Sequence, residues 1–116
     1  MLLIPAYAAA GCKHLPGHYS VIETHNNNEP SHGGTADIKA TPEKGTFNLY
    51  LNMTGKTNPY PLTLLCSHNP GSETYEISIK NMHGHTLTAQ TKNTDNFSPF
   101  WQDSFGHYEY LHFTRQ

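Results

Sequence analysis

The segment Gly45–Ser67, GTFNLYLNMTGKTNPYPLTLLCS, carries the strongest secondary-structure signal in the chain. Apolar and polar residues alternate along its first part, the loop GKTNPYP follows, and the alternation then resumes. A period of two places the apolar side chains on one face of a strand. The segment therefore predicts a β-hairpin with one buried face. The apolar set is Phe47, Leu49, Leu51 and Met53 on the first strand and Leu62, Leu64 and Cys66 on the second.

Short alternating runs recur elsewhere in the chain, separated by turn-forming Asn, Gly and Pro residues. No run of ten or more residues has a helical period. We therefore predict a single all-β domain over residues 12–116, folded as one antiparallel β-barrel or β-sandwich of seven to eight strands. Residues 92–104 are expected to be irregular. The other predicted strands are 17–24, 35–40, 74–80, 87–89 and 106–115.

The composition excludes several classes of function. Only 14% of the 116 residues are charged, against about 25% in an average protein, and the net charge is −2. This balance offers no electrostatic basis for binding nucleic acid or an anionic membrane. No apolar stretch reaches the ~18 residues needed for a transmembrane helix.

Residues 1–11, MLLIPAYAAAG, resemble the end of a signal peptide. Ala6-Tyr7-Ala8 has the small-x-small form that signal peptidase requires. We expect a signal-peptide remnant or, alternatively, an N-terminal arm or edge strand. Ala9-Ala10-Gly11-Cys12 is also close to a lipobox, which would make Cys12 a lipid anchor. These features favour a periplasmic or secreted protein.

Cys12 and Cys66 are the only cysteines. Two cysteines in a chain with a possible export signal predict one disulfide. The alternative is a pair of buried free thiols. No C-x-x-C motif or Cys/His metal spacing is present.

A resemblance to a known family rests on the two ends of the predicted barrel. Gly17-His18-Tyr19 opens the first strand and Arg115 ends the last one. This arrangement resembles the small calycin barrels of the lipocalin and avidin type, which begin with a Gly-x-Trp strand. In lipocalins an Arg from the end of the barrel packs across that Trp. The resemblance implies that Tyr19 and Arg115 take these places and that the barrel holds a ligand cavity.

Nine histidines are the oddity of the composition. His83 and His85 lie two residues apart, so on a strand they would share a face and could bind Zn or Cu. His68 or His107 would supply a third ligand if their strands neighbour this pair. The alternative is a set of surface histidines at turns, with no cofactor.

Aromatic residues gather where strand alternation is missing. Loops are normally polar, so aromatic side chains there need an explanation. We interpret them as a binding surface for a protein or a small apolar ligand, because aromatic anchors dominate interface energetics. The alternative is a plug at one end of the barrel. The predicted binding residues are Phe97, Phe100, Trp101, Phe105, Tyr108 and Tyr110, and Tyr50 would extend the surface.

No nucleophile motif such as G-x-S-x-G is present, so we expect no catalytic residues and no enzyme. Glu23 and Glu109 would nevertheless meet if the first and last strands pair, as a general acid/base pair requires. The sequence favours an exported, non-enzymatic binding module, such as an inhibitor or an accessory subunit. Two further hypotheses are a His-based metal protein and a structural or assembly component that acts through a sheet edge.

Overall fold

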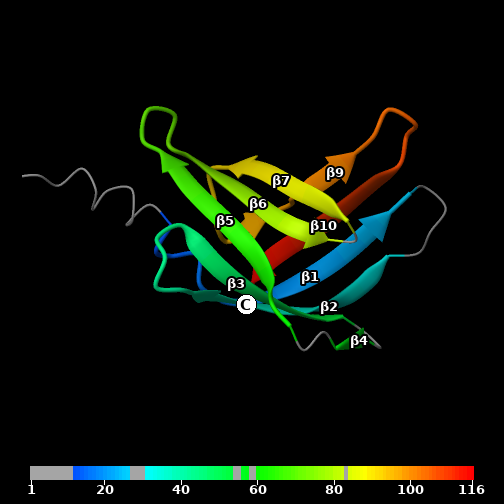
Figure 1. Ribbon diagram of the computed structural model, residues 1–116, viewed down its shortest axis with the longest axis horizontal. Coiled ribbons are helices and arrows are strands. Elements are labelled where there is room, and N and C mark those ends of the chain that lie inside the picture. The colour runs from blue at the N-terminus through cyan, green and yellow to red at the C-terminus, as the bar shows by residue number, and fades with distance from the viewer. Residues whose placement is uncertain (1–11, 27–30, 54–55, 58–59, 83) are drawn as a thin grey trace, which may run out of the picture.

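The computed structural model describes residues 12–26, 31–53, 56–57, 60–82 and 84–116, and this part of the chain is built from β-strands and turns. Figure 1 shows the strands curled around a single interior. The strands are β1 (Gly17–His25), β2 (His32–Ala40), β3 (Thr46–Met53), β4 (Lys56–Thr57), β5 (Leu62–Asn69), β6 (Thr74–Met82), β7 (His85–Thr91), β8 (Asn96–Phe97), β9 (Phe100–Gln102) and β10 (Tyr108–Arg115).

Eight of these strands close into an antiparallel barrel. They pair in the order β1-β2-β3-β5-β6-β7-β9-β10, and β10 pairs back with β1. That last pairing runs from Tyr19 opposite Arg115 to His25 opposite Glu109. The short strands β4 and β8 add to β3 and β10. The fold is therefore a barrel and not a sandwich. Because the ring is closed, each of its described strands has a neighbouring strand on both sides, although β7 and β9 are joined at a single residue pair, Thr88 opposite Phe100.

The predicted hairpin is present as β3 and β5, whose register runs from Thr46 opposite Leu65 to Leu49 opposite Leu62. Its apolar face is buried as expected, and Leu49 and Leu64 have no exposed surface. Alternation of two therefore identified the buried face correctly.

Residues 92–104 are less irregular than the sequence suggests. β8 and β9 lie within this segment and both pair with β10. Pro99 separates them because it has no N–H to give to the sheet, and its carbonyl accepts the N–H of Leu111 at 3.0 Å. The interruption hides the alternation on which a strand prediction depends.

Side chains from around the ring fill the interior as one apolar cluster. Tyr19, Val21, Leu111 and Phe113 contribute from the β1–β10 seam. The other buried members are Cys12, Leu15, Ala36, Ile38, Phe47, Leu49, Leu51, Leu64, Cys66, Ile77, Ile79, Met82, Leu87 and Phe97.

Arg115 closes one end of the barrel. Its guanidinium carbon lies 4.7 Å from the centre of the Tyr19 ring, which is the contact that the Gly-x-Tyr motif implies. The guanidinium also donates to the Asp95 carboxylate at 2.5 Å and to the carbonyls of Pro16 at 3.1 Å and His14 at 2.5 Å. Burial raises the pKa of Tyr19 to about 12; the Asp95 carboxylate adds to this rise and Arg115 opposes it.

A disulfide secures the segment that covers this end. Cys12 is bonded to Cys66 of β5, with their Cα atoms 6.3 Å apart. Between Cys12 and β1, Leu15 is fully buried and its carbonyl accepts the Tyr19 hydroxyl at 2.5 Å. The predicted disulfide is therefore confirmed, and a thiol held in it is not available to a lipid anchor.

Residues 1–11, where we expect a signal-peptide remnant or an arm, lie outside the described residues. Within the part of the chain that is described, no helix has the length and apolar character needed to cross a membrane.

Candidate functional site

The inward-facing row of the β1–β10 seam changes from apolar to polar at the end opposite Arg115. On β1 the row reads Tyr19, Val21, Glu23 and His25, because every second side chain points inward. On β10 Glu109 continues the inward row, and it lies directly opposite His25. Strand closure thus brings two carboxylates and an imidazole together inside the barrel.

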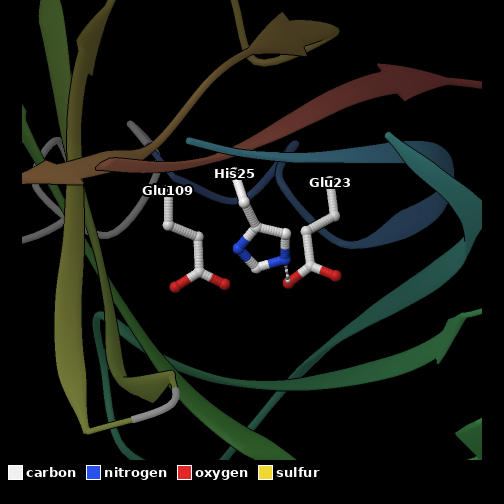
Figure 2. Close-up of side chains that lie close together, drawn as sticks. All are labelled: Glu23, His25 and Glu109. Atoms are coloured by element: carbon white, nitrogen blue, oxygen red, sulfur yellow. Dashed lines mark ion pairs between the residues drawn. The ribbon is translucent and has the colours of Figure 1, made fainter. Parts of the chain in front are cut away.

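Glu23, His25 and Glu109 form a compact cluster. Each offers one oxygen or nitrogen atom, and these three atoms lie within 4.8 Å of one another. Glu23 Oε2 is 3.4 Å from His25 Nε2. Figure 2 shows the imidazole between the two carboxylates, with a ring nitrogen on the side of each. The proximity of Glu23 and Glu109 expected from barrel closure is therefore present, and His25 lies between them.

Both carboxylates of this cluster are withdrawn from water. Glu23 is 7% exposed and Glu109 is 3% exposed. A buried charge is costly unless it is paired, hydrogen-bonded or bound to a metal ion. The cluster is therefore a place where a positive charge is favoured, whether on the imidazole or on a bound cation.

A pocket of about 350 Å³ opens beside the cluster, at what we call the mouth of the barrel. This volume is within the range of ~300–1,000 Å³ that is usual for small-ligand sites. The lining combines aromatic rings with hydrogen-bonding groups. It consists of His25, Asn26, His85, Trp101, His107, Tyr108 and Glu109.

Trp101 and His85 form one wall of the pocket. Their rings are stacked, with centres 3.6 Å apart and planes 16° from parallel. Trp101 lies opposite Glu109 in the sheet and is half-buried, whereas its neighbours Phe100 and Gln102 are exposed. The indole therefore points to the inside of the barrel, as an aromatic platform next to the carboxylate of Glu109.

The β9–β10 loop at the mouth is held by Asp103. Its carboxylate accepts the backbone N–H groups of Phe105 at 2.8 Å and His107 at 2.9 Å, and its other oxygen is 2.9 Å from His107 Nδ1. Desolvation raises the pKa of Asp103, but the hydrogen bonds outweigh it, led by that of the His107 side chain, and the pKa lies below its ordinary value of 3.8. Asn26 adds a tie by accepting the N–H of Tyr108 at 2.8 Å. The rim is therefore ordered by hydrogen bonds.

The predicted binding aromatics are distributed over four places: the core, the mouth, the β9–β10 loop and the outside of the barrel. Phe97 is in the core, stacked on Phe113 at 4.7 Å between ring centres, and at 3% exposure it has no surface for a partner. Its position reflects the pairing of β8 with β10, where Phe97 lies opposite Phe113, and the local sequence does not reveal this pairing. Trp101 belongs to the mouth. Phe105, at 84% exposure, projects from the β9–β10 loop.

Phe100 and Tyr110 lie on the outside of the barrel, and Tyr108 adjoins them at the rim, where it also lines the pocket. Phe100 stacks on Tyr110 at 5.3 Å, and Tyr110 contacts Tyr108 and His112, each at 5.5 Å between ring centres. We call Phe100, Tyr108, Tyr110 and His112 the outer aromatic row. Tyr50 is on β3, where Lys39 covers its ring at 5.5 Å, and it does not join this row.

The predicted histidine ligands are only partly brought together. His85 is in the pocket wall, but His83 lies outside the described residues. His107 also lines the pocket and contacts Asp103. His68 contacts Tyr75 with the two rings tilted by 43° and their centres 4.8 Å apart, near the β5–β6 turn. His25 was missed because its partners depend on the register of strands at opposite ends of the chain.

The sequence matches no family model and no curated protein. Among solved structures, the chain is similar to a redesigned β-barrel, with 17% sequence identity and a TM-score of 0.52. The likeness covers 94% of this chain and 95% of that one. At this level of identity the similarity concerns the fold alone, and it identifies the chain as a small antiparallel β-barrel.

Proposed function

We propose that this protein is an exported, non-enzymatic binding module that holds a small ligand in the mouth of its barrel. The observation that supports this most directly is the pocket of about 350 Å³, whose walls come from β1, β7, β9 and β10. Side chains on rigid strands hold a binding geometry better than side chains on loops.

The chemistry of the lining favours a flat ligand with a polar group. The stacked rings of Trp101 and His85 offer a face to a planar group. Tyr108, His107 and Glu109 add hydrogen-bonding groups around it. The sequence by itself favours a protein partner or an apolar ligand; the lining favours an amphipathic one.

The closed end of the barrel supports a lipocalin- or avidin-like arrangement within this proposal. Arg115 packs on Tyr19 where the resemblance places an Arg on the ring of the first strand. The resemblance implies a ligand cavity, and the mouths of β-barrels are common places for small-ligand sites. The disulfide between Cys12 and Cys66 supports export, because disulfides persist in oxidising compartments.

A direct test uses the intrinsic fluorescence of the protein, because Trp101 is the single tryptophan. We expect a flat amphipathic probe, such as tryptamine or anilinonaphthalene sulfonate, to change the emission of Trp101. The change should saturate when one molecule of probe is bound per protein chain. The indole of tryptamine would itself emit, so calorimetry is the readout for that probe. Replacing His85 by Ala removes half of the stacked wall and should weaken binding about tenfold, in line with the energy of an aromatic pair.

The matched control is Tyr110→Ala, which removes an aromatic ring from the outer aromatic row and leaves the mouth intact. We expect this variant to bind the probe as the natural chain does. Absence of saturable binding by either probe would contradict the proposal. If Tyr110→Ala lost probe binding and His85→Ala kept it, the binding surface would lie on the outside of the barrel.

That second outcome corresponds to a specific alternative, the binding of a protein partner by the outer aromatic row. Phe100 is 40% exposed, and Ile22 of β1, which lies opposite His112 of the row, is 50% exposed. Exposed aromatic residues are enriched at protein interfaces. The mouth is favoured because it combines a pocket with converging polar groups.

A further inference from the structure

The floor of the mouth contains three groups that are common metal ligands. Glu23 and His25 come from β1, and Glu109 comes from β10. The positions of their donor atoms follow from strand register and not from a loop. Three atoms separated by no more than 4.8 Å share a central point at most about 2.8 Å from each.

That central point is close to a metal-binding distance. Zinc lies about 2.0–2.2 Å from carboxylate oxygen and imidazole nitrogen. Each donor would therefore have to move by less than about 1 Å, which rotation about side-chain bonds supplies. The sheet itself would not have to change.

The charge of the cluster also suits a divalent cation. Two carboxylates, 3% and 7% exposed, together carry two negative charges into a region of low dielectric when both are ionised. Among the described residues that line the pocket, histidine is the only basic type. A dication bound by two carboxylates and a neutral imidazole makes the group electrically neutral.

We propose that Glu23, His25 and Glu109 bind a divalent transition-metal ion, with Zn²⁺ as the first candidate. Two oxygen donors and one nitrogen donor suit first-row metals better than Mg²⁺ or Ca²⁺, which take oxygen ligands almost exclusively. The adjoining pocket supplies room for water, so the site would keep an open coordination position. The site shares His25 and Glu109 with the lining of the ligand pocket, but none of its donors belongs to the stacked wall of Trp101 and His85, so the two proposals are tested by different variants.

The competing interpretation is that His25 is itself the cation. Figure 2 shows its ring between the two carboxylates, an arrangement that also suits an imidazolium bonded to both. In that case no metal would be bound. The two interpretations differ in what Zn²⁺ does to the full-length protein.

The experiment is a Zn²⁺ titration of the full chain, without an affinity tag, against a chromophoric chelator. We expect one Zn²⁺ to bind with a Kd below about 1 μM, and Glu23→Gln and Glu109→Gln to weaken it about 100-fold each, since removal of a ligand leaves a two-donor site. A Co²⁺ absorption spectrum of the natural chain should show ligand-field bands that His25→Gln abolishes.

Matched controls come from an exposed pair on the same sheet. His18 on β1 contacts Asp37 on β2, so His18→Gln and Asp37→Asn alter the same chemical groups at a surface position. Their Zn²⁺ affinity should stay within about threefold of that of the natural chain. A thermal unfolding curve for each variant establishes that it is folded.

Two results would overturn the proposal. One is equal Zn²⁺ affinity in Glu23→Gln, Glu109→Gln and the natural chain, which would assign binding to surface histidines. The other is no binding at 100-fold excess metal, which would leave His25 as the cation of the cluster. Neither result decides the proposed ligand function. That function is tested by the probe titration with His85→Ala, and the metal site is tested by the Zn²⁺ titration with Glu23→Gln.

Discussion

Gly17, at the closed end of the barrel, has little freedom to change. A Cβ atom added at this position would lie 2.5 Å from Nη1 of Arg115, and the backbone has φ of +152°. The guanidinium cannot easily retreat, because it is bonded to Asp95 and to the carbonyls of His14 and Pro16. The glycine of the Gly-x-Tyr motif is therefore required by the packing of Arg115 on Tyr19.

We expect Gly17→Ala to reduce the free energy of unfolding by about 1–3 kcal/mol, because it combines an unfavourable φ with a steric overlap. Urea denaturation followed by circular dichroism measures the change. Gly33→Ala is the matched control: a Cβ there meets nothing within 4 Å and φ is not in the left-handed range. Equal stability of the two variants would show that Arg115 is not held as described.

At the scale of elements, the segment before β1 contributes to the fold only because it is tied to β5. Residues 12–16 cover the closed end, and the disulfide joins Cys12 to Cys66 over a sequence separation of 54. Both cysteines are buried in the apolar cluster. The bond restricts the unfolded chain and keeps Leu15 over Tyr19 in the folded one.

Replacement of both cysteines by Ala should lower the free energy of unfolding by about 4 kcal/mol, the loop-closure value for a ring of this length. Chemical denaturation under non-reducing conditions measures the loss. The natural chain treated with reductant serves as the control and should lose a similar amount. A loss below about 1 kcal/mol would mean that the segment is held by packing alone.

At the scale of the whole molecule, stability depends on the seam where β1 meets β10. Their register extends over seven residue pairs, from Tyr19 opposite Arg115 to His25 opposite Glu109. The seam both closes the barrel and assembles the Glu23, His25 and Glu109 cluster. If the β1–β10 seam opened, the edges of both strands would be exposed to water, and the cluster at the mouth would be lost at the same time.

Hydrogen exchange tests whether the seam belongs to the stable part of the structure. We expect amides that bond across β1 and β10 to exchange only through global unfolding, as slowly as those of the β5–β6 pair. Amides of the two-residue strand β4 should exchange much faster. Fast exchange along β1 and β10, with β5 and β6 protected, would indicate an open sheet and not a closed barrel.

Local pattern in the sequence was enough to predict the all-β class, the buried face of the β3–β5 hairpin and the disulfide. Alternation is a property of neighbouring residues, so it is readable without knowledge of the partner strand. The disulfide followed from the presence of only two cysteines, Cys12 and Cys66. The Arg115–Tyr19 contact followed from a resemblance that links the two ends of the barrel.

Tertiary structure alone decided that the sheet closes into a barrel, that β8 and β9 join it, and that His25 lies between Glu23 and Glu109. Each of these depends on which strands pair and in what register. A shift of one residue would turn the opposite side chains inward. The register between strands near the two ends of the chain is set by packing of the whole core. The cluster at the mouth therefore cannot be predicted from local sequence patterns.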